Sequence, residues 1–370
     1  MGAIRYIVAG SLIDGTGAAP QRQVFLAVQH GIIAAIGAVA DLPREVAATA
    51  VDLSHCVLVP ALVDCSVSLT HSPAVATAVS TDAAALVERH IRYCHEYGVL
   101  GVADSDETGL VERYRDGSLI DLRTAGRDFL RVIYSSPIED EESVPPGVSQ
   151  EALCRLLREK GERKAVVVAN GAQSVAEALA AGADGIEQGY SMGEANLRQM
   201  AEKGVLWIPR VLTAKNGLDG ARSDGAVCCR FSQRYVAPGK PLPGAEAFWK
   251  KTLAEQMAQL RLARELGVQV GIGTGAGGLG IIHGEAMVEE MKLFMKAGYS
   301  LEETIRCGSA NGARFFGMEN LGALTKGRRA TFLVTRGAVS QLPRKLAYLE
   351  NIYVDGVPST AYRKNPVRSA

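Results

Sequence analysis

Apolar and polar residues alternate near the start of the chain in the manner of β-strands. Val24, Leu26 and Val28 recur at every second position, and the turn 29–31 leads into a second apolar run, 32–36. This spacing predicts a β-hairpin. A second β-rich piece spans residues 330–356. Neither piece has enough strands to close a sheet alone, so we expect both chain ends to meet in one small β-sandwich.

The middle of the chain has a different pattern, in which short apolar runs alternate with helical segments that end at glycine. The run 165–169 precedes a predicted helix at 174–181, and a long amphipathic stretch, 245–266, precedes the run 268–272. Continuously apolar runs are typical of parallel strands that are covered on both faces. Repeated strand–helix units close most simply into an α/β fold of the (β/α)₈ TIM-barrel type, with a doubly wound open sheet as the competing interpretation.

The two patterns together predict two domains. Residues 1–58 and 320–370 form the composite β-sandwich, and residues 59–319 form the barrel. Within the barrel, residues 213–248 contain several glycines and prolines, which predicts a long loop after the seventh strand.

Composition narrows the classes of function. The 370 residues carry 40 Lys and Arg against 40 Asp and Glu, a formal net charge of zero. A nucleic-acid or membrane-surface binder needs surplus basic charge, so we expect neither partner. Seven cysteines without a Cys-x-x-Cys pair, together with an N-terminus that lacks a signal-peptide layout, favour reduced thiols in the cytoplasm. No apolar run is long enough to predict a membrane-spanning helix.

Five phrases in the sequence carry a resemblance to a known family. They are 13–17 (IDGTG), 57–64 (VLVPALVD), 186–189 (IEQG), 273–277 (GTGAG) and 321–330 (LGALTKGRRA). In these phrases the chain resembles the amidohydrolase superfamily, in its imidazolonepropionase-like and prolidase-like branch. The resemblance implies a barrel with a split β-sandwich and, in most members, hydrolysis of C–N bonds by one or two divalent metals at the carboxyl ends of the barrel strands.

The same resemblance places unusual residues at the metal-ligand positions. The first-strand His-x-His pair falls on Ser66 and Ser68, the fifth- and sixth-strand histidines on Asn170 and Gln188, the eighth-strand Asp on Gly275, and the fourth-strand Lys on Arg131. Hydroxyl and amide groups are weak ligands for Zn²⁺, and an arginine cannot be carbamylated. We therefore expect no metal and no cofactor. Cys65, His71 and His283 lack a chelating spacing and offer only a remote alternative metal site.

The remaining polar residues suggest what the pocket contacts. Arg210 follows the seventh predicted strand, where its guanidinium would face the pocket and bind a carboxylate or phosphate. His71 follows the first strand and is interpreted as a partly exposed loop residue. No Ser-His-Asp arrangement is visible in the order of the sequence.

These observations lead to one hypothesis and two alternatives. The leading hypothesis is a metal-free protein that binds a small polar or anionic molecule, or performs a non-hydrolytic reaction, through Ser66, Ser68, Arg131, Asn170, Gln188, Arg210 and Gly275. The first alternative is a hydrolase of non-peptide C–N bonds, such as a cyclic amide or an N-acyl amino acid, with a rearranged site. The second is a noncatalytic partner subunit of an active relative. The sequence leaves open whether any reaction is catalysed and whether the chain forms a homo-oligomer.

Overall fold

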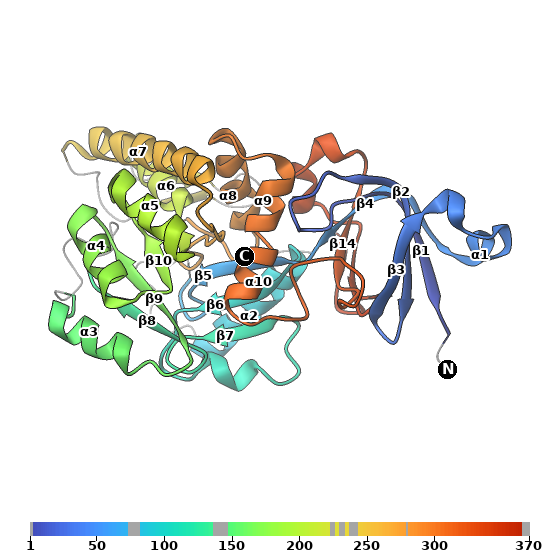
Figure 1. The fold of residues 1–370 in the computed structure, drawn as a ribbon, viewed down its shortest axis with the longest axis horizontal. Helices are drawn as coiled ribbons and strands as arrows, with labels where there is room; N and C mark the ends of the chain where they lie inside the picture. The colour runs from blue at the N-terminus through green and yellow to red at the C-terminus, as the bar shows by residue number, and fades with distance from the viewer. Residues whose placement is uncertain are drawn as a thin grey trace.

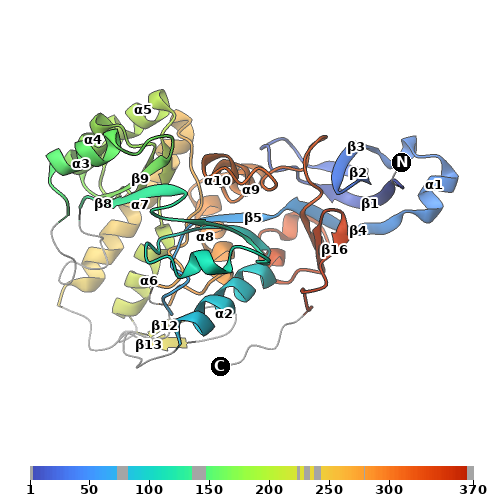
Figure 2. The same ribbon diagram turned by 90° about the horizontal axis from the view of Figure 1, so that it is seen from below.

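The computed structural model describes residues 3–72, 82–135, 147–222, 226–228, 234–236, 243–278 and 280–364. Figures 1 and 2 show an α/β body in which helices surround a set of strands, with a β-sheet projecting at one side. No helix among the described residues is long and apolar enough to cross a membrane.

The projecting sheet is built from both ends of the chain, as the alternating pattern predicts. Its strand order is β16-β15-β14-β4-β1-β2-β3. The strands are β1 (Arg5–Leu12), β2 (Gln21–Gln29), β3 (Ile32–Ala38), β4 (Val51–Pro60), β14 (Phe332–Arg336), β15 (Asn351–Val354) and β16 (Val357–Pro358). Side chains such as Leu26, Leu58 and Phe332 form a separate apolar core in this sheet. The predicted hairpin is β2–β3, and His30 and Gly31 take the positive φ angles that its turn requires.

The barrel strands follow in chain order. They are β5 (Leu62–Val67), β6 (Val99–Asp104), β7 (Asp121–Thr124), β8 (Phe129–Ile133), β9 (Lys164–Ala169), β10 (Gly185–Gln188) and β11 (Leu206–Ile208). They pair in parallel as β5-β6-β7 and β8-β9-β10-β11.

An extended segment, 269–276, closes the ring in place of an eighth regular strand. On one side, Trp207 N donates to Gln269 O at 2.8 Å. On the other side, Cys65 N donates to Ile272 O at 2.8 Å. Backbone bonds on both sides make this segment the barrel wall between β11 and β5, which confirms the TIM-barrel prediction.

Helices cover the barrel, mostly where the glycine-terminated pattern places them. They are α2 (Ala83–Glu96), α3 (Gln150–Arg158), α4 (Ala172–Ala181), α5 (Gly193–Lys203), α6 (Val211–Arg222), α7 (Ala245–Leu266), α8 (Glu285–Lys296), α9 (Leu301–Cys307) and α10 (Ala310–Phe315), with α1 (Arg44–Thr49) beside the sheet. Between β6 and β8 the chain uses a short 3₁₀ helix, Val111–Tyr114, and a four-residue turn instead of α-helices.

One expectation from the sequence is wrong. The glycine and proline content predicts that residues 213–222 begin a long loop, but they belong to helix α6. The carboxyl group of Glu290 on α8 accepts hydrogen bonds from the backbone N–H groups of Val211 and Leu212, both at 2.7 Å, and so stabilises the first turn of α6. This distant partner cannot be seen in the local sequence. Residues 223–225, 229–233 and 237–242 of the expected loop lie outside the described residues.

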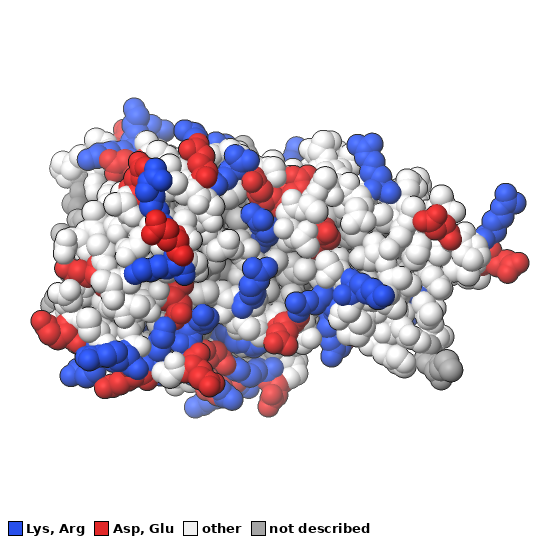
Figure 3. Space-filling model, viewed as in Figure 1, with Lys and Arg blue, Asp and Glu red and all other residues white. Residues whose placement is uncertain are grey.

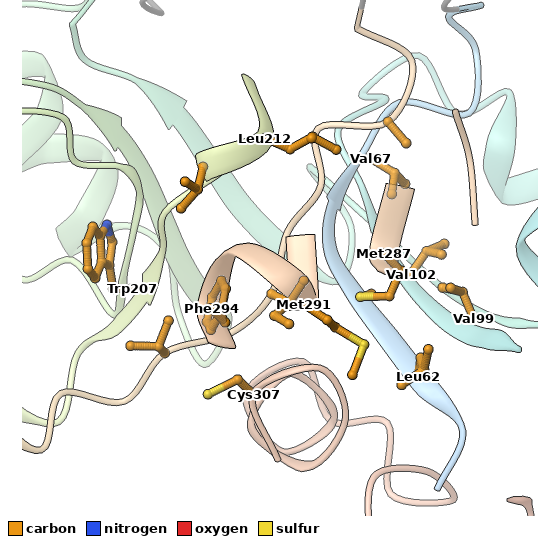
Figure 4. Close-up of a cluster of buried hydrophobic side chains, with 14 of the residues drawn as sticks. Leu62, Val67, Val99, Val102, Trp207, Leu212, Met287, Met291, Phe294 and Cys307 are labelled. Atoms are coloured by element: carbon orange, nitrogen blue, oxygen red, sulfur yellow. The ribbon is translucent and has the colours of Figure 1, made fainter. Parts of the chain in front are cut away.

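The main apolar core lies between the barrel wall and its helices. Figure 4 shows Met291 and Phe294 of α8 lying between Trp207 of β11 and Leu62 of β5. All four side chains are fully buried. This packing fixes α8 against the two strands that flank the closing segment, and therefore fixes the end of the barrel where the candidate residues lie.

Candidate functional site at the barrel mouth

The carboxyl ends of the barrel strands bring together three of the residues singled out in the sequence. Ser66 of β5, Arg131 of β8 and Arg210, just after β11, all contact the carboxylate of Glu187 on β10. These elements are the first, fourth, seventh and sixth barrel strands in chain order. Their side chains therefore meet inside the barrel, at the end where TIM-barrel proteins build their sites.

Glu187 is the centre of this group. Its Oε2 accepts a hydrogen bond from Nε of Arg131 at 2.8 Å. Its Oε1 accepts from Arg131 Nη2 at 3.0 Å, Ser66 Oγ at 3.0 Å and Arg210 Nη1 at 3.2 Å. The side chain is 2% exposed. Despite this burial, the adjacent guanidinium groups of Arg131 and Arg210 lower the pKa of Glu187 to about 2.

Two arginines share one carboxylate. Arg131 and Arg210 both form ion pairs with Glu187. The side chain of Arg131 is 16% exposed, and its Nη1 donates to none of the described residues. The cluster therefore presents a guanidinium donor toward the barrel mouth.

Two buried carboxyl groups lie close to this cluster. Asp64 of β5 accepts from Thr274 Oγ1 at 2.5 Å and from Thr274 N at 2.9 Å. Asp104 of β6 accepts from the backbone of Leu69 at 2.6 Å. Burial raises the pKa of Asp64 and of Asp104 to about 6, while Arg210 and Arg131 oppose that rise. The charge of the barrel mouth therefore changes near neutral pH.

Gly275 makes room for Arg210. A Cβ atom at Gly275 would lie 2.4 Å from Nη2 and 2.6 Å from Nε of Arg210, and the residue has a φ of +71°. Any larger residue would displace the guanidinium from Glu187. Glycine at position 275 of the phrase GTGAG thus allows the closing segment to pack closely against Arg210, and it also tolerates the positive φ angle there.

Asn170 and Gln188 form a second pair beside the cluster. Asn170 Nδ2 donates to Gln188 Oε1 at 2.6 Å, and Asn170 Oδ1 accepts from Tyr190 N at 3.0 Å. Gln188 is fully buried and Asn170 is half-buried. Both amides are engaged with protein partners.

The backbone at the ends of β10 and β11 is held in an unusual conformation. Gln188 and Arg210 have φ angles of +72° and +48°, which non-glycine residues seldom adopt. The Gln188 carbonyl accepts from Trp207 Nε1 and from Gln256 Nε2, both at 2.9 Å. The Arg210 carbonyl accepts from Tyr190 Oη at 2.7 Å. Backbone strain of this kind is often found at functional sites, where surrounding contacts maintain it.

Ser68 lies apart from the Glu187 cluster. It follows the end of β5, and its Oγ lies 2.6 Å from Nδ1 of His71. Of the other residues of the suggested metal alternative, Cys65 is buried, and His283 bonds through Nε2 to the Ser68 carbonyl while its ring is stacked on His90 with centroids 3.8 Å apart. Over the described parts of the chain, no group of three or more His, Cys, Asp or Glu residues has the geometry to hold a metal ion.

Glu187, the central residue, is missed by the sequence analysis, although a signal is present. It lies in the short strand 185–188 between buried neighbours, and a carboxylate within a buried strand requires a charged partner. The partners themselves cannot be assigned from the sequence, because Arg131 and Arg210 are 56 and 23 residues away in the chain.

Comparison with known proteins agrees with this architecture. The model of the amidohydrolase family matches residues 139–362. The chain belongs to the amidohydrolase family. This result confirms the resemblance seen in the five sequence phrases. No curated protein sequence matches the chain.

Solved structures of other amidohydrolase-like proteins have the same fold. A Xaa-Pro dipeptidase with bound methionine superposes with a TM-score of 0.78 at 18% identity, covering 96% of this chain and 100% of that one. The ochratoxinase of A. niger superposes with a TM-score of 0.76 at 15% identity, covering 96% of this chain and 95% of that one. Molinate hydrolase superposes with a TM-score of 0.75 at 15% identity, covering 100% of this chain and 99% of that one. At these identities the likeness concerns the fold.

The surface does not carry a single sign of charge on the face drawn in Figure 3. Lysine and arginine side chains alternate there with aspartate and glutamate over both the barrel and the sheet. The two arginines of the candidate site, Arg131 and Arg210, lie inside the barrel.

Proposed function

We propose that this amidohydrolase-family member works without a divalent metal and binds a small anionic molecule, such as a carboxylate or phosphate compound, at its barrel mouth. The observation that carries the proposal is Glu187 bonded by Arg131, Arg210 and Ser66. These hydrogen bonds occupy the oxygens of Glu187, so the carboxylate is not free to bind a metal ion. The two guanidinium groups also place positive charge where a divalent cation would have to lie.

The donor chemistry does not fit the metal that the family implies. Ser66, Asn170 and Gln188 offer neutral oxygens, which bind Zn²⁺ weakly in comparison with imidazole and carboxylate. Glu187 accepts four hydrogen bonds from three side chains. Two guanidinium groups beside it repel a divalent cation. These side chains therefore favour a reaction or binding event that does not use a metal-bound water.

The same chemistry favours an anion. An arginine fork binds carboxylates and phosphates through paired, charge-assisted hydrogen bonds. Nη1 of Arg131 donates to none of the described residues and is available for such a bond. A small ligand that enters the barrel mouth would meet Arg131 first, because Arg131 is more exposed than Glu187.

Calorimetric titration of the purified protein with inorganic phosphate tests the proposal. We expect saturable binding by the wild type and about tenfold weaker binding by Arg131→Lys, which keeps the charge but loses the planar fork. Arg198→Lys, on the exposed face of α5, is the matched control and should bind as the wild type does. Unaltered affinity in Arg131→Lys would contradict the assignment.

The alternative function is hydrolysis of a non-peptide C–N bond. It is supported by the names of the structural neighbours, which are a dipeptidase and hydrolases. It requires a nucleophile that does not depend on a metal. Stoichiometric binding of Zn²⁺ or Mn²⁺ by the purified chain, with activity restored by the metal, would favour this alternative in its usual family form.

A further inference from the structure

A serine and a histidine are hydrogen-bonded beside the barrel mouth, outside the Glu187 cluster. Ser68 Oγ lies 2.6 Å from His71 Nδ1. This distance fits an O–H donor that bonds to an imidazole nitrogen, with the other ring proton on Nε2. Ser68 is half-buried and His71 is exposed, so the imidazole is in reach of solvent and of a ligand. A nucleophile in hydrogen-bond contact with a base is the geometry that covalent catalysis requires.

The main chain on both sides holds Ser68 in position. Its N–H donates to Ala276 O on the closing segment at 2.8 Å. Its carbonyl accepts from Nε2 of His283 at 2.9 Å. His283 is fully buried and stacks on His90, so it cannot swing away from this bond. The serine is therefore fixed by rigid elements, and its hydroxyl is the part of the residue that remains for chemistry.

Ser68 lies just past the carboxyl end of β5, two residues after Ser66, which reaches Glu187 inside the barrel. Gly277 packs closely against Ser68 and His71. A Cβ at Gly277 would lie 2.6 Å from the Ser68 carbonyl oxygen and 3.3 Å from the Cβ of His71, so a larger residue would not fit there. The chain thus runs past Arg210 at Gly275, within the closing segment, and past Ser68 at Gly277, directly after it.

We propose that Ser68 is the nucleophile, and His71 the general base, of a metal-independent acyl-transfer reaction at the barrel mouth. Ser68 Oγ attacks the carbonyl carbon of an ester or amide while its proton passes to His71 Nδ1. The bond from the carbonyl carbon to the leaving group then breaks, and the leaving group takes that proton with the electron pair. Water next attacks the acyl-serine, gives a proton to His71, and releases the acid as the proton returns to Ser68 Oγ.

The arginine cluster indicates the class of substrate, and this step rests on the proposed function. Arg131 lies on β8 inside the barrel and Ser68 lies just past the carboxyl end of β5, so a molecule with its anionic group at Arg131 would extend toward the barrel mouth, where Ser68 lies. The substrate is accordingly an acyl compound with a carboxylate or phosphate at one end and an ester or amide at the other. An anion site and a nucleophilic hydroxyl at the same end of the barrel would hold the reacting carbonyl group close to the hydroxyl.

Labelling with diisopropyl fluorophosphate tests the nucleophile directly, because the reagent carries no anionic group and so does not depend on Arg131. Attack by Ser68 Oγ forms an O–P bond, expels fluoride and leaves one diisopropylphosphoryl group on the chain. Mass spectrometry should find this group on the peptide that contains Ser68. Ser68→Ala should remain unlabelled, while Ser54→Ala, at a half-buried serine of the β-sheet domain, should label as the wild type does.

The base is tested by the rate of the same labelling. His71→Gln should label about 10²–10⁴-fold more slowly, which is the range of general-base effects. His55→Gln, at an exposed histidine of the sheet, is the control and should keep the wild-type rate. A melting temperature of Ser68→Ala equal to that of the wild type would show that the fold of the variant is intact. The proposal is overturned if intact wild type is not labelled at Ser68, or if His71→Gln labels at the wild-type rate.

Arg131→Lys separates this proposal from the proposed function. If both are correct, this variant loses phosphate affinity and keeps the labelling rate at Ser68. Labelling at Ser68 in a wild-type protein that does not bind phosphate would retain the nucleophile and reject the anion site. Phosphate binding without labelling at Ser68 would retain the anion site and reject the nucleophile.

Discussion

Arg131 and Glu187 form a two-bond ion pair across the barrel, with Nε to Oε2 at 2.8 Å and Nη2 to Oε1 at 3.0 Å. The pair joins the fourth barrel strand to the sixth. Both side chains are largely removed from water, at 16% and 2% exposed. Charges in such surroundings depend on their partners, because a buried charge without a partner is strongly destabilising.

Replacing the carboxylate should therefore destabilise the protein strongly. Glu187→Gln removes the buried carboxylate that Arg131 and Arg210 both contact, and we expect the free energy of unfolding to fall by about 3–5 kcal/mol. The matched control is Glu194→Gln on α5, which removes the partner of Arg198 from an exposed pair. That substitution should cost less than about 1 kcal/mol in urea denaturation. Equal effects of the two substitutions would refute the central place given to Glu187.

Close contact at Gly275 provides a second test. In Gly275→Ala the new methyl group meets the Arg210 guanidinium, which is held by Glu187 and cannot move freely. Gly161→Ala is the control, since its φ of +64° is close to the +71° of Gly275 and nothing lies within 4 Å of its Cβ. We expect Gly275→Ala to lose about 1–3 kcal/mol more than Gly161→Ala in chemical denaturation. It should also weaken phosphate binding, which the control should not.

Buried Glu290 predicts a dependence of stability on pH. Burial raises the pKa of Glu290 to about 8, although it accepts two backbone N–H groups of α6. The folded state thus holds this proton more tightly than the unfolded state, whose glutamates have a pKa of about 4.3. The contribution of Glu290 is fully present below about pH 4.3 and declines as the pH rises toward 8.

Comparison with Glu290→Gln isolates that contribution. The difference in unfolding free energy, wild type minus variant, should become smaller between pH 5 and pH 8. Denaturant titrations at several pH values measure it. A difference that stays constant or grows with pH would show that Glu290 does not keep its proton on folding.

Anion affinity should also depend on pH. The pKa values of Asp64 and Asp104 are raised to about 6, so both carboxyl groups take up protons as the pH falls from 7.5 to 5. The nearby charges of Arg131, Arg210 and Glu187 do not change in this interval, and the cluster becomes more positive. Sulfate, whose own charge is constant there, should bind about tenfold more tightly at pH 5 than at pH 7.5 at fixed ionic strength. Weaker sulfate binding at pH 5 would contradict this account.

Much of the architecture can be predicted from local sequence patterns. The helix α7 occupies Ala245–Leu266, as its amphipathic pattern predicts, and Gly267 ends it in the left-handed conformation. The hairpin β2–β3 likewise follows from alternation and from the turn at His30 and Gly31. Elements of this kind depend on neighbours within a few residues.

The elements that could not be predicted depend on distant partners. Helix α6 begins where Glu290, 79 residues from Val211, accepts its first N–H group. Likewise, sequence reasoning places Ser66, Arg131 and Arg210 near the barrel mouth but does not find Glu187, which joins them. Asn170 and Gln188 are expected to line the pocket, and the structure pairs them with each other. Ser68 is expected there too, but its contact with His71 depends on how the chain turns after β5.

The most direct test of the central claim is a crystal structure of the protein grown with both Zn²⁺ and sulfate, recorded at the zinc absorption edge. The account predicts a sulfate ion bonded to Arg131 and no anomalous peak in contact with Ser66, Asn170 or Gln188. A fully occupied zinc ion bound by those side chains would contradict it and return metal-dependent hydrolysis to first place.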